Sequence, residues 1–292
     1  MKKLTCESIS KEIKDFVKSS PLNRMVGSEK DIYFDEPLVQ FADGADPLFE
    51  EYKTIIGAEH LKPLEALALS EKCDPASLPE HVSVISYILP IAEATRKSNR
   101  LETKVPSRCW SHTRYYGELL NDAVRKHIVE FLKAEGHKAC APGMPGGIFK
   151  MFRNEKGMYS NWSERHVAYA AGLGTFSLSD GFITERGIAH RCGNAVVALE
   201  LTPSPRKAAG PYANCLFYAG EKCVACIKRC PAGAITEKGH DKNKCREYLN
   251  SIGYNPQQAY DVNKSVFGCG MCQTKVPCED RNPVKKLKKK AA

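Results

Sequence analysis

Residues 223–231 read CVACIKRCP, with three cysteines in eight residues and a proline directly after the third. The chain has 292 residues and 13 cysteines, and eight of these cysteines lie between positions 215 and 278. That region shows little apolar periodicity, so side-chain burial alone gives it a poor core. Cysteines at this density, in a chain that we expect to be cytoplasmic, indicate metal or redox chemistry before disulfides.

The spacing of these cysteines resembles that of bacterial two-cluster ferredoxins. Those proteins carry the pattern C-x2-C-x2-C-x3-C-P, whose last cysteine binds the other cluster. Applied to this chain, the pattern predicts two [4Fe-4S] clusters with no cysteine of the region left over. One cluster would be held by Cys215, Cys223, Cys226 and Cys278, and the other by Cys230, Cys245, Cys269 and Cys272.

Two spacings depart from the ferredoxin pattern. Seven residues separate Cys215 from Cys223, and five separate Cys272 from Cys278. Zinc is the alternative metal, because two C-x2-C knuckles can hold one ion with four thiolates. A single zinc site leaves Cys230 and three further cysteines unexplained, so we favour iron–sulfur clusters.

The first 204 residues have the periodicity of an ordinary folded domain. Mixed helices and strands predict an α+β fold, with an α/β layered domain at residues 1–204 and a cysteine-rich domain at 205–292 that ends in a basic tail. The linker TPSPRKAAGP joins the two domains. Helices are expected at 6–18, 63–72, 111–135 and 163–172, and strands at 81–89, 137–141 and 192–201.

Charge and hydropathy limit the possible partners. The formal charge is +9, but five lysines between 285 and 290 contribute to it, and two clusters with their eight thiolates would lower it to roughly +5. We therefore expect no nucleic-acid partner, and keep a zinc-stabilised nucleic-acid binder as the alternative. No apolar run of about 18 residues occurs, so no membrane span is expected. Charged residues interrupt the N-terminal stretch, and we expect no signal peptide.

Three stretches of the cysteine-rich region resemble a known enzyme family. CPAGAI (230–235), KCREYL (244–249) and GCGMCQ (268–273) are similar to the cluster region of epoxyqueuosine reductases. These are cobalamin-dependent iron–sulfur enzymes related to reductive dehalogenases. The resemblance implies a nitroreductase-like, corrinoid- and substrate-binding domain followed by a ferredoxin-like domain with two clusters.

The resemblance extends upstream and implies candidate site residues. ERHVAYAAGLG (164–174), RYYGELL (114–120) and SVISYILP (83–90) are similar to further family segments. The family's proton-donating aspartate falls on Met158, which cannot donate, so Tyr159 becomes the candidate catalytic residue. Candidate cofactor-binding residues are Tyr116, Gly172, Leu173, Gly174 and Asp180.

The family's function carries over as an expectation with one change. Electrons from a ferredoxin- or flavodoxin-type donor would pass through two clusters to cobalamin or to a substrate. Thr175 and Leu178 replace an aromatic and a basic residue of the family, and only 14 residues follow Cys278 where tRNA-modifying members continue into a helical tail. We therefore expect an oxidoreductase acting on a small molecule or unknown substrate other than epoxyqueuosine. The alternative is a non-catalytic, ferredoxin-like electron carrier or corrinoid-reducing partner.

One further cysteine has a histidine close to it in the sequence. A thiol nucleophile at Cys192, activated by His190, is possible in principle. Nothing in the sequence establishes their geometry, and the simpler interpretation is structural. We expect the five cysteines outside the cluster region to be small buried hydrophobic residues: Cys6, Cys73, Cys109, Cys140 and Cys192.

Overall fold

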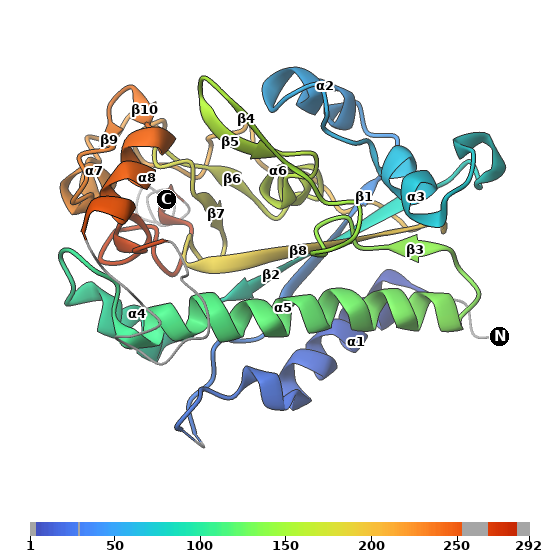
Figure 1. Cartoon of the computed structure of the whole chain (residues 1–292), viewed down its shortest axis with the longest axis horizontal. Helices are drawn as coiled ribbons and strands as arrows, with labels where there is room; N and C mark the ends of the chain where they lie inside the picture. The colour runs from blue at the N-terminus through green and yellow to red at the C-terminus, as the bar shows by residue number, and fades with distance from the viewer. Residues whose placement is uncertain (1–3, 29, 253–267, 285–292) are drawn as a thin grey trace, which may run out of the picture.

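The computed structural model describes residues 4–28, 30–252 and 268–284. It is a mixed helix and sheet protein, as predicted, built on a four-stranded antiparallel sheet of order β1-β2-β8-β3 (Figure 1). The strands are β1 (Leu38–Asp43), β2 (Ser83–Pro90), β8 (His190–Val197) and β3 (Ala139–Cys140).

Strand β2 forms the middle of the sheet and is buried along its whole length. Ile85 pairs with Phe41 on one side and with Ala195 on the other. Alternate residues of a strand point to opposite faces. Ile85 and Leu89 accordingly pack into one apolar cluster, and Val84 and Ile88 into a second.

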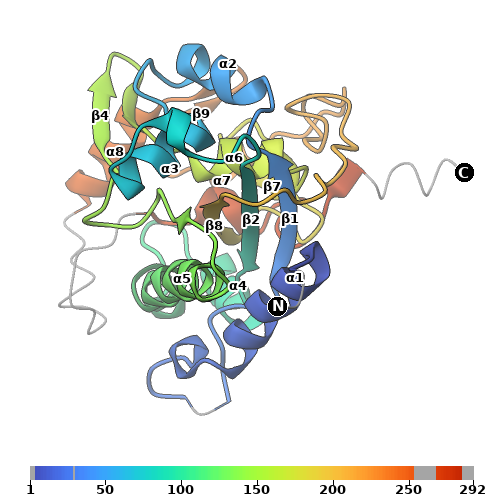
Figure 2. The ribbon, with the colours of Figure 1, turned by 90° about the vertical axis from the view of Figure 1, so that its right-hand side faces the viewer.

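Helices cover both faces of the sheet (Figure 2). Apolar residues of α1 (Cys6–Ser19) and α5 (Arg108–Ala134) form the first cluster with the sheet. Those of α2 (Leu48–Ile55), α3 (Pro63–Glu71) and α6 (Glu164–Ala170) form the second. The sheet is therefore the middle layer of three, as expected for a sheet buried on both sides.

Local chemistry explains where the predicted elements begin and end. Helix α5 starts three residues before the predicted position because the Ser107 hydroxyl accepts the Trp110 N–H at 3.2 Å and caps it. Gly136, with φ +87, stands just beyond its end. Strand β8 covers 190–197 where 192–201 was predicted, since Leu201 N–H bonds the Ser83 side chain instead of a neighbouring strand.

The elements after the sheet are short. They include three two-stranded antiparallel sheets. The strands are β4 (Met151–Asn154), β5 (Gly157–Ser160), β6 (Gly174–Phe176), β7 (Phe182–Thr184), β9 (Ile235–Thr236) and β10 (Gly239–His240). The β4–β5 pair precedes α6, the β6–β7 pair follows it, and the β9–β10 pair lies in the cysteine-rich region (Figure 1). The remaining helices are α4 (Glu93–Arg100), α7 (Ala225–Arg229), α8 (Lys242–Ser251) and the 3-10 turns η1 (Pro21–Asn23), η2 (Pro75–Ser77) and η3 (Met271–Gln273). Within the described ranges, no helix is both long and apolar enough to cross a bilayer.

Candidate functional site

Four of the eight clustered cysteines lie around one small cavity. Cys215, Cys223, Cys226 and Cys278 line it together with apolar side chains such as Ile183. The pKa of Cys226 is raised to about 11, mainly by burial and then by the neighbouring thiols of Cys215 and Cys223. The structure thus brings together the four cysteines predicted for the first cluster.

The other four cysteines form a second group at α7, α8 and η3. Burial raises the pKa of Cys245 to about 11, and Cys269 and Cys230 contribute to the shift. The pKa of Cys272 is raised as well. Burial is the largest cause, and the charges of Cys269, Cys245 and Cys230 come next. This second group has the membership predicted for the second cluster.

The two groups are close neighbours but do not resemble a single-ion site. The charge of Cys226, from the first group, acts on the pKa of Cys272 in the second. Among the described residues, no three His, Cys, Asp or Glu side chains converge as ligands of one metal ion do. A four-iron cluster spreads its ligands more widely, because each thiolate binds a different iron.

Cys278 is attached to the N-terminal half of the chain. Its carbonyl oxygen accepts the Ile188 N–H at 2.8 Å, next to the start of β8. The adjacent carboxylate of Glu279 is buried, and Arg100 of α4 donates to it through Nε at 2.9 Å and Nη2 at 2.6 Å. Arg96 approaches the same carboxylate at 3.4 Å. The long spacing before Cys278 therefore lets this residue reach the sheet.

Cys269 is held by α4 and by the start of α5. Asn99 Nδ2 donates to the Cys269 carbonyl at 3.0 Å, and Trp110 Nε1 donates to the Gly268 carbonyl at 3.1 Å. Gly270 has φ +67, and a Cβ there would lie 2.1 Å from the Trp110 indole. Sequence reasoning missed Asn99 and Trp110, because no local pattern marks residues that support a loop about 160 positions away.

A cavity of about 360 Å³ lies between the β4–β5 hairpin, α6, β6 and α8. Tyr159, the candidate catalytic residue, lines it next to Met158. Its hydroxyl donates to Glu59 Oε2 at 2.9 Å, and this bond raises the pKa of Tyr159. The phenol is available at the cavity, but Glu59 already engages its proton.

Asp180 lines the same cavity. It has φ +57, a backbone conformation that Asp tolerates better than most residues. Its Oδ2 lies 3.5 Å from His240 Nδ1, and the Arg165 guanidinium donates to its carbonyl oxygen. Burial raises the pKa of Asp180, but the His240 hydrogen bond and the Lys242 charge outweigh burial, so the net shift is downward.

The other candidate cofactor contacts lie away from this cavity. A Cβ at Gly172 would meet the Pro205 carbonyl at 2.8 Å, and one at Gly174 would meet that of Ile183 at 2.3 Å. Leu173 belongs to the second apolar cluster. Tyr116 packs against the first apolar cluster, with its ring 6.3 Å from that of Tyr33. In the described structure these residues pack the fold, and their role toward a cofactor stays a prediction.

The possible thiol nucleophile is not activated. Cys192 Sγ lies 3.7 Å from His190 Nδ1. Burial raises the pKa of Cys192 to about 12 and lowers that of His190 to about 4. A neutral thiol beside a neutral imidazole is therefore the stable state. Of the five cysteines expected to be buried, Cys140 and Cys192 are; for Cys6, Cys73 and Cys109 that expectation is wrong, because they are only half-buried.

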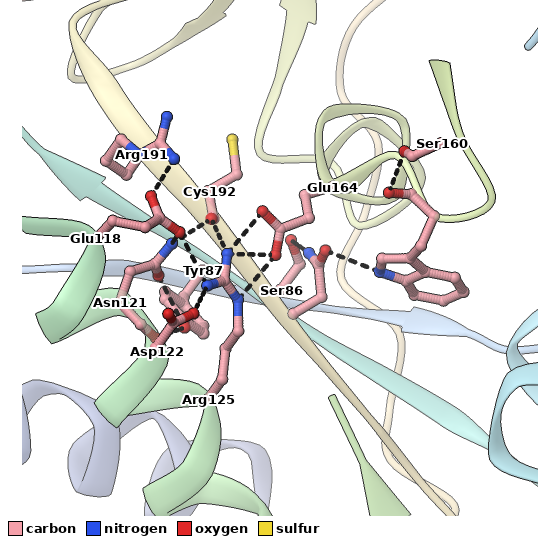
Figure 3. A network of polar contacts seen from close by, with 12 residues as sticks. Ser86, Tyr87, Glu118, Asn121, Asp122, Arg125, Ser160, Glu164, Arg191 and Cys192 are labelled. Carbon is pink, nitrogen blue, oxygen red and sulfur yellow. Dashed lines mark hydrogen bonds and ion pairs between the residues drawn. The ribbon is translucent and has the colours of Figure 1, made fainter. Parts of the chain in front are cut away.

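A buried charge network lies behind the site and joins α5, α6 and β8 (Figure 3). Arg125 pairs with Glu118 at 3.0 Å, Asp122 at 2.6 Å and Glu164 at 2.8 Å. Burial raises the pKa of Glu118, but the charges of Arg191 and Arg125 outweigh burial and lower it to about 2. Glu164, from the Glu-Arg pair of the predicted family segment, thus belongs to a structural network, whereas Arg165 lines the cavity.

The fold and the site define a mixed helix and sheet protein with two groups of four cysteines beside a small cavity. No family model matches the chain. Over 67 residues the chain is 39% identical to an epoxyqueuosine reductase of Francisella cf. novicida (strain Fx1), covering 22% of this chain and 18% of that protein. A catabolic reductive dehalogenase superposes with a TM-score of 0.52 at 13% identity, over 86% of this chain and 31% of that one. Epoxyqueuosine reductase from Bacillus subtilis superposes with a TM-score of 0.47 at 18% identity, over 94% and 66%.

The predicted resemblance to epoxyqueuosine reductases and reductive dehalogenases is thereby confirmed: the sequence match is to the former, and the fold is shared with the latter. The chain matches under a fifth of the curated relative's length and spans less than two thirds of each structure. The activity, substrate and partners of this chain are therefore matters for proposal.

Proposed function

We propose that this protein is an oxidoreductase that carries electrons through two [4Fe-4S] clusters toward a substrate in its N-terminal half. The observation that carries the proposal is the convergence of eight cysteines into two groups of four, in the crossed order of two-cluster ferredoxins. The proposed layout is a nitroreductase-like domain at 1–204 and a ferredoxin-like domain at 205–292.

The cysteines fit the proposed clusters. In both groups burial is the main cause that raises thiol pKa values, at Cys226 and Cys278 in the first and at Cys245, Cys269 and Cys272 in the second, and this disfavours the free thiolates. Iron relieves that cost, because it binds the thiolate directly. Cys226 is near enough to Cys272 to act on its pKa, and this proximity of the two groups would give electrons a short route from one cluster to the other.

The chain's own residues would prepare the cavity for a reduction. Arg165 and Lys242 place positive charge at its wall, where they stabilise charge that develops on a reduced substrate. Tyr159 and the Asp180–His240 pair are the groups through which a proton could reach that wall. Phe176 and Tyr212 restrict water on the apolar side.

A corrinoid is proposed as the second cofactor on the strength of the family resemblance. The cavity of about 360 Å³ lies at the lower end of the range of small-molecule sites, roughly 300–1,000 Å³. It suits a substrate better than a complete corrinoid with its side chains. A bound corrinoid would supply low-potential two-electron chemistry, and no step described above depends on it.

The test is anaerobic purification followed by metal analysis and titration with base-off cobalamin. About eight irons per chain, with broad absorption near roughly 400 nm, are expected for two clusters. Zinc without iron would overturn the proposal. Eight irons with a bound, reducible corrinoid would establish the enzyme type, whereas eight irons without corrinoid affinity would favour the alternative, a ferredoxin-like carrier or corrinoid-reducing partner.

The proposed partners are a one-electron donor of the ferredoxin or flavodoxin type and a small-molecule substrate. A small substrate is supported by the size of the cavity and by Met158 at the position where the family resemblance implies a proton donor. Reduction assays with a flavodoxin and a ferredoxin, monitored by the bleaching of cluster absorption, test the donor.

A further inference from the structure

Three cationic side chains from distant parts of the sequence meet at the cavity beside Tyr159. Lys156 lies in the turn between β4 and β5, Arg165 lies on α6, and Lys242 begins α8. Lys242 reaches over the hairpin, since a Cβ added to Gly157 would lie 3.2 Å from the Lys242 Cβ. These segments lie together above the sheet in Figure 1.

Within the described ranges, cationic side chains outnumber carboxylates at this cavity by three to one. Among the described residues, none of the three cations makes an ion pair with a carboxylate. Asp180 carries the one carboxylate among the residues lining the cavity, and His240 holds it at 3.5 Å. Arg165 uses one N–H on the Asp180 carbonyl oxygen, which leaves further donors of its guanidinium for a ligand.

Two titratable groups at the wall respond to this field. Burial, followed by the charges of Arg165, His60 and Lys242, lowers the pKa of His166 to about 3. The pKa of Asp180 is lowered as well, by His240, Lys242 and Arg165 against the effect of burial. For His166 burial is the largest cause and the cations add to it, whereas for Asp180 the neighbouring groups outweigh burial. The Asp180 shift therefore indicates a positive potential at this wall.

The rest of the lining combines aromatic and apolar side chains with three polar ones, Asn154, Ser160 and Ser163. The ring of Phe176 lies 4.6 Å from that of His166 and 6.5 Å from that of Tyr212. Met151 and Met158 line the cavity although they are 52% and 45% exposed. Exposed apolar side chains grouped around a cavity mark a binding site more often than chance.

We propose that this cavity binds a small organic anion, with its charged end toward Arg165 and Lys242 and a flat apolar body against Phe176 and Tyr212. The inference deepens the proposed function, on which it rests, because it names the chemical class of the substrate. The volume of about 360 Å³ accommodates a molecule of one or two rings.

The test compares three probes on the iron-loaded protein by calorimetry or saturation-transfer NMR. Benzoate is the flat anion, benzamide is its neutral isostere, and cyclohexanecarboxylate is an anion without a flat ring. We expect benzoate to bind at least tenfold more tightly than benzamide and more tightly than cyclohexanecarboxylate, because charge-assisted hydrogen bonds are the stronger ones. Equal binding of benzoate and benzamide, or no binding of benzoate, would overturn the anion site; parity between the two carboxylates would overturn the flat body.

Two lysine variants locate the effect. Lys242→Gln is expected to weaken benzoate binding by about tenfold, the size of one charge-assisted contact. Lys238→Gln is the matched control, because Lys238 is an exposed lysine between β9 and β10 that does not line the cavity. Equal affinities of the two variants would show that benzoate binds elsewhere and contradict the proposal.

Further readouts separate this inference from the proposed function and from a macromolecular ligand. A protein with full iron content that fails to bind benzoate overturns the anion site alone. If anaerobically purified protein contains zinc and no iron but still binds benzoate, the anion site is kept and the cluster proposal is overturned. Displacement of benzoate by a short RNA hairpin at lower concentration would assign the cations to nucleic-acid phosphates and overturn the small-anion proposal.

Discussion

The sheet half and the cysteine-rich half of this chain are held together by different means. The sheet is covered on both faces by helices, and two apolar clusters fill the space between them. A third buried cluster joins the halves: Leu178, Ile183 and Ile188 come from the sheet half, and the cysteine-rich half adds only three residues, among them Cys215, with four more cysteines packed against them. One half thus folds by burying apolar surface. For the other we expect a dependence on the proposed clusters, beside its contacts with α4 and with the segment before β8.

Removing iron gives the largest expected difference between the halves. Without clusters, each group of four thiols lacks its common partner, so we expect the amides of α7, α8 and 268–280 to lose protection. Those of β2 and α5 keep it, because their core contains no cysteine of either group. Hydrogen exchange on iron-loaded and iron-free protein measures this. Equal loss of protection in both halves would show that the sheet also depends on the clusters.

A single methyl group should remove the second cluster. In Gly270→Ala the new Cβ would meet the Trp110 indole at 2.1 Å, on a backbone with φ +67. Displacing this loop separates Cys269 and Cys272 from their partners, so we expect iron content to fall by about half. Metal analysis checks it. Gly210→Ala is the control, because its Cβ meets nothing within 4 Å; equal iron in both variants would contradict the supporting role of Trp110.

Within the sheet half, a variant of the charge network measures how much the buried ion pairs contribute to the free energy of unfolding. Arg125→Met leaves Glu118, Asp122 and Glu164 without their shared cation, and removing one partner from a buried pair costs about 3–5 kcal/mol. Urea denaturation of the sheet half measures the loss. Lys126→Met, one residue along α5 and 68% exposed, should change stability little. Similar midpoints for the two variants would mean that the network is dispensable.

The smallest effect is a pH dependence confined to the sheet half. Burial lowers the pKa of His60 to about 4 from 6.5, so the unfolded chain binds more protons than the folded one between these values. The contribution of His60 to stability therefore falls as the pH drops below 6.5, by about 2 kcal/mol at about pH 5, and the lowered pKa values of His166 and His190 act in the same direction. Denaturation of wild type and His60→Gln at several pH values checks it. Identical slopes for both proteins would show that His60 does not carry the effect.

Local pattern predicted much of the fold and of the cysteine grouping. Helix α5 was predicted at 111–135 and found at Arg108–Ala134, because apolar residues recur along its buried face. The order of the cysteines was enough to sort them into two groups, because in the ferredoxin pattern the last cysteine of each motif binds the other cluster. Trp110 and Asn99 were missed, because Gly268 and Cys269 lie 158 and 170 positions away; Arg125 was missed because the network it centres includes Glu164, which lies 39 positions away. The cofactor role assigned to Gly172 and Gly174 stays a prediction; what the structure adds is that their missing side chains let backbones approach closely.

The position of Cys278 has a consequence for biosynthesis. Cys215, Cys223 and Cys226 are synthesised before every cysteine of the second group, whereas Cys278 is synthesised after all of them. It reaches its place only by bonding to Ile188 at the start of β8. In the proposed ligand scheme, iron delivered during translation therefore meets an incomplete first site. The sheet must be assembled, and the chain synthesised beyond Cys278, before that cluster can be closed.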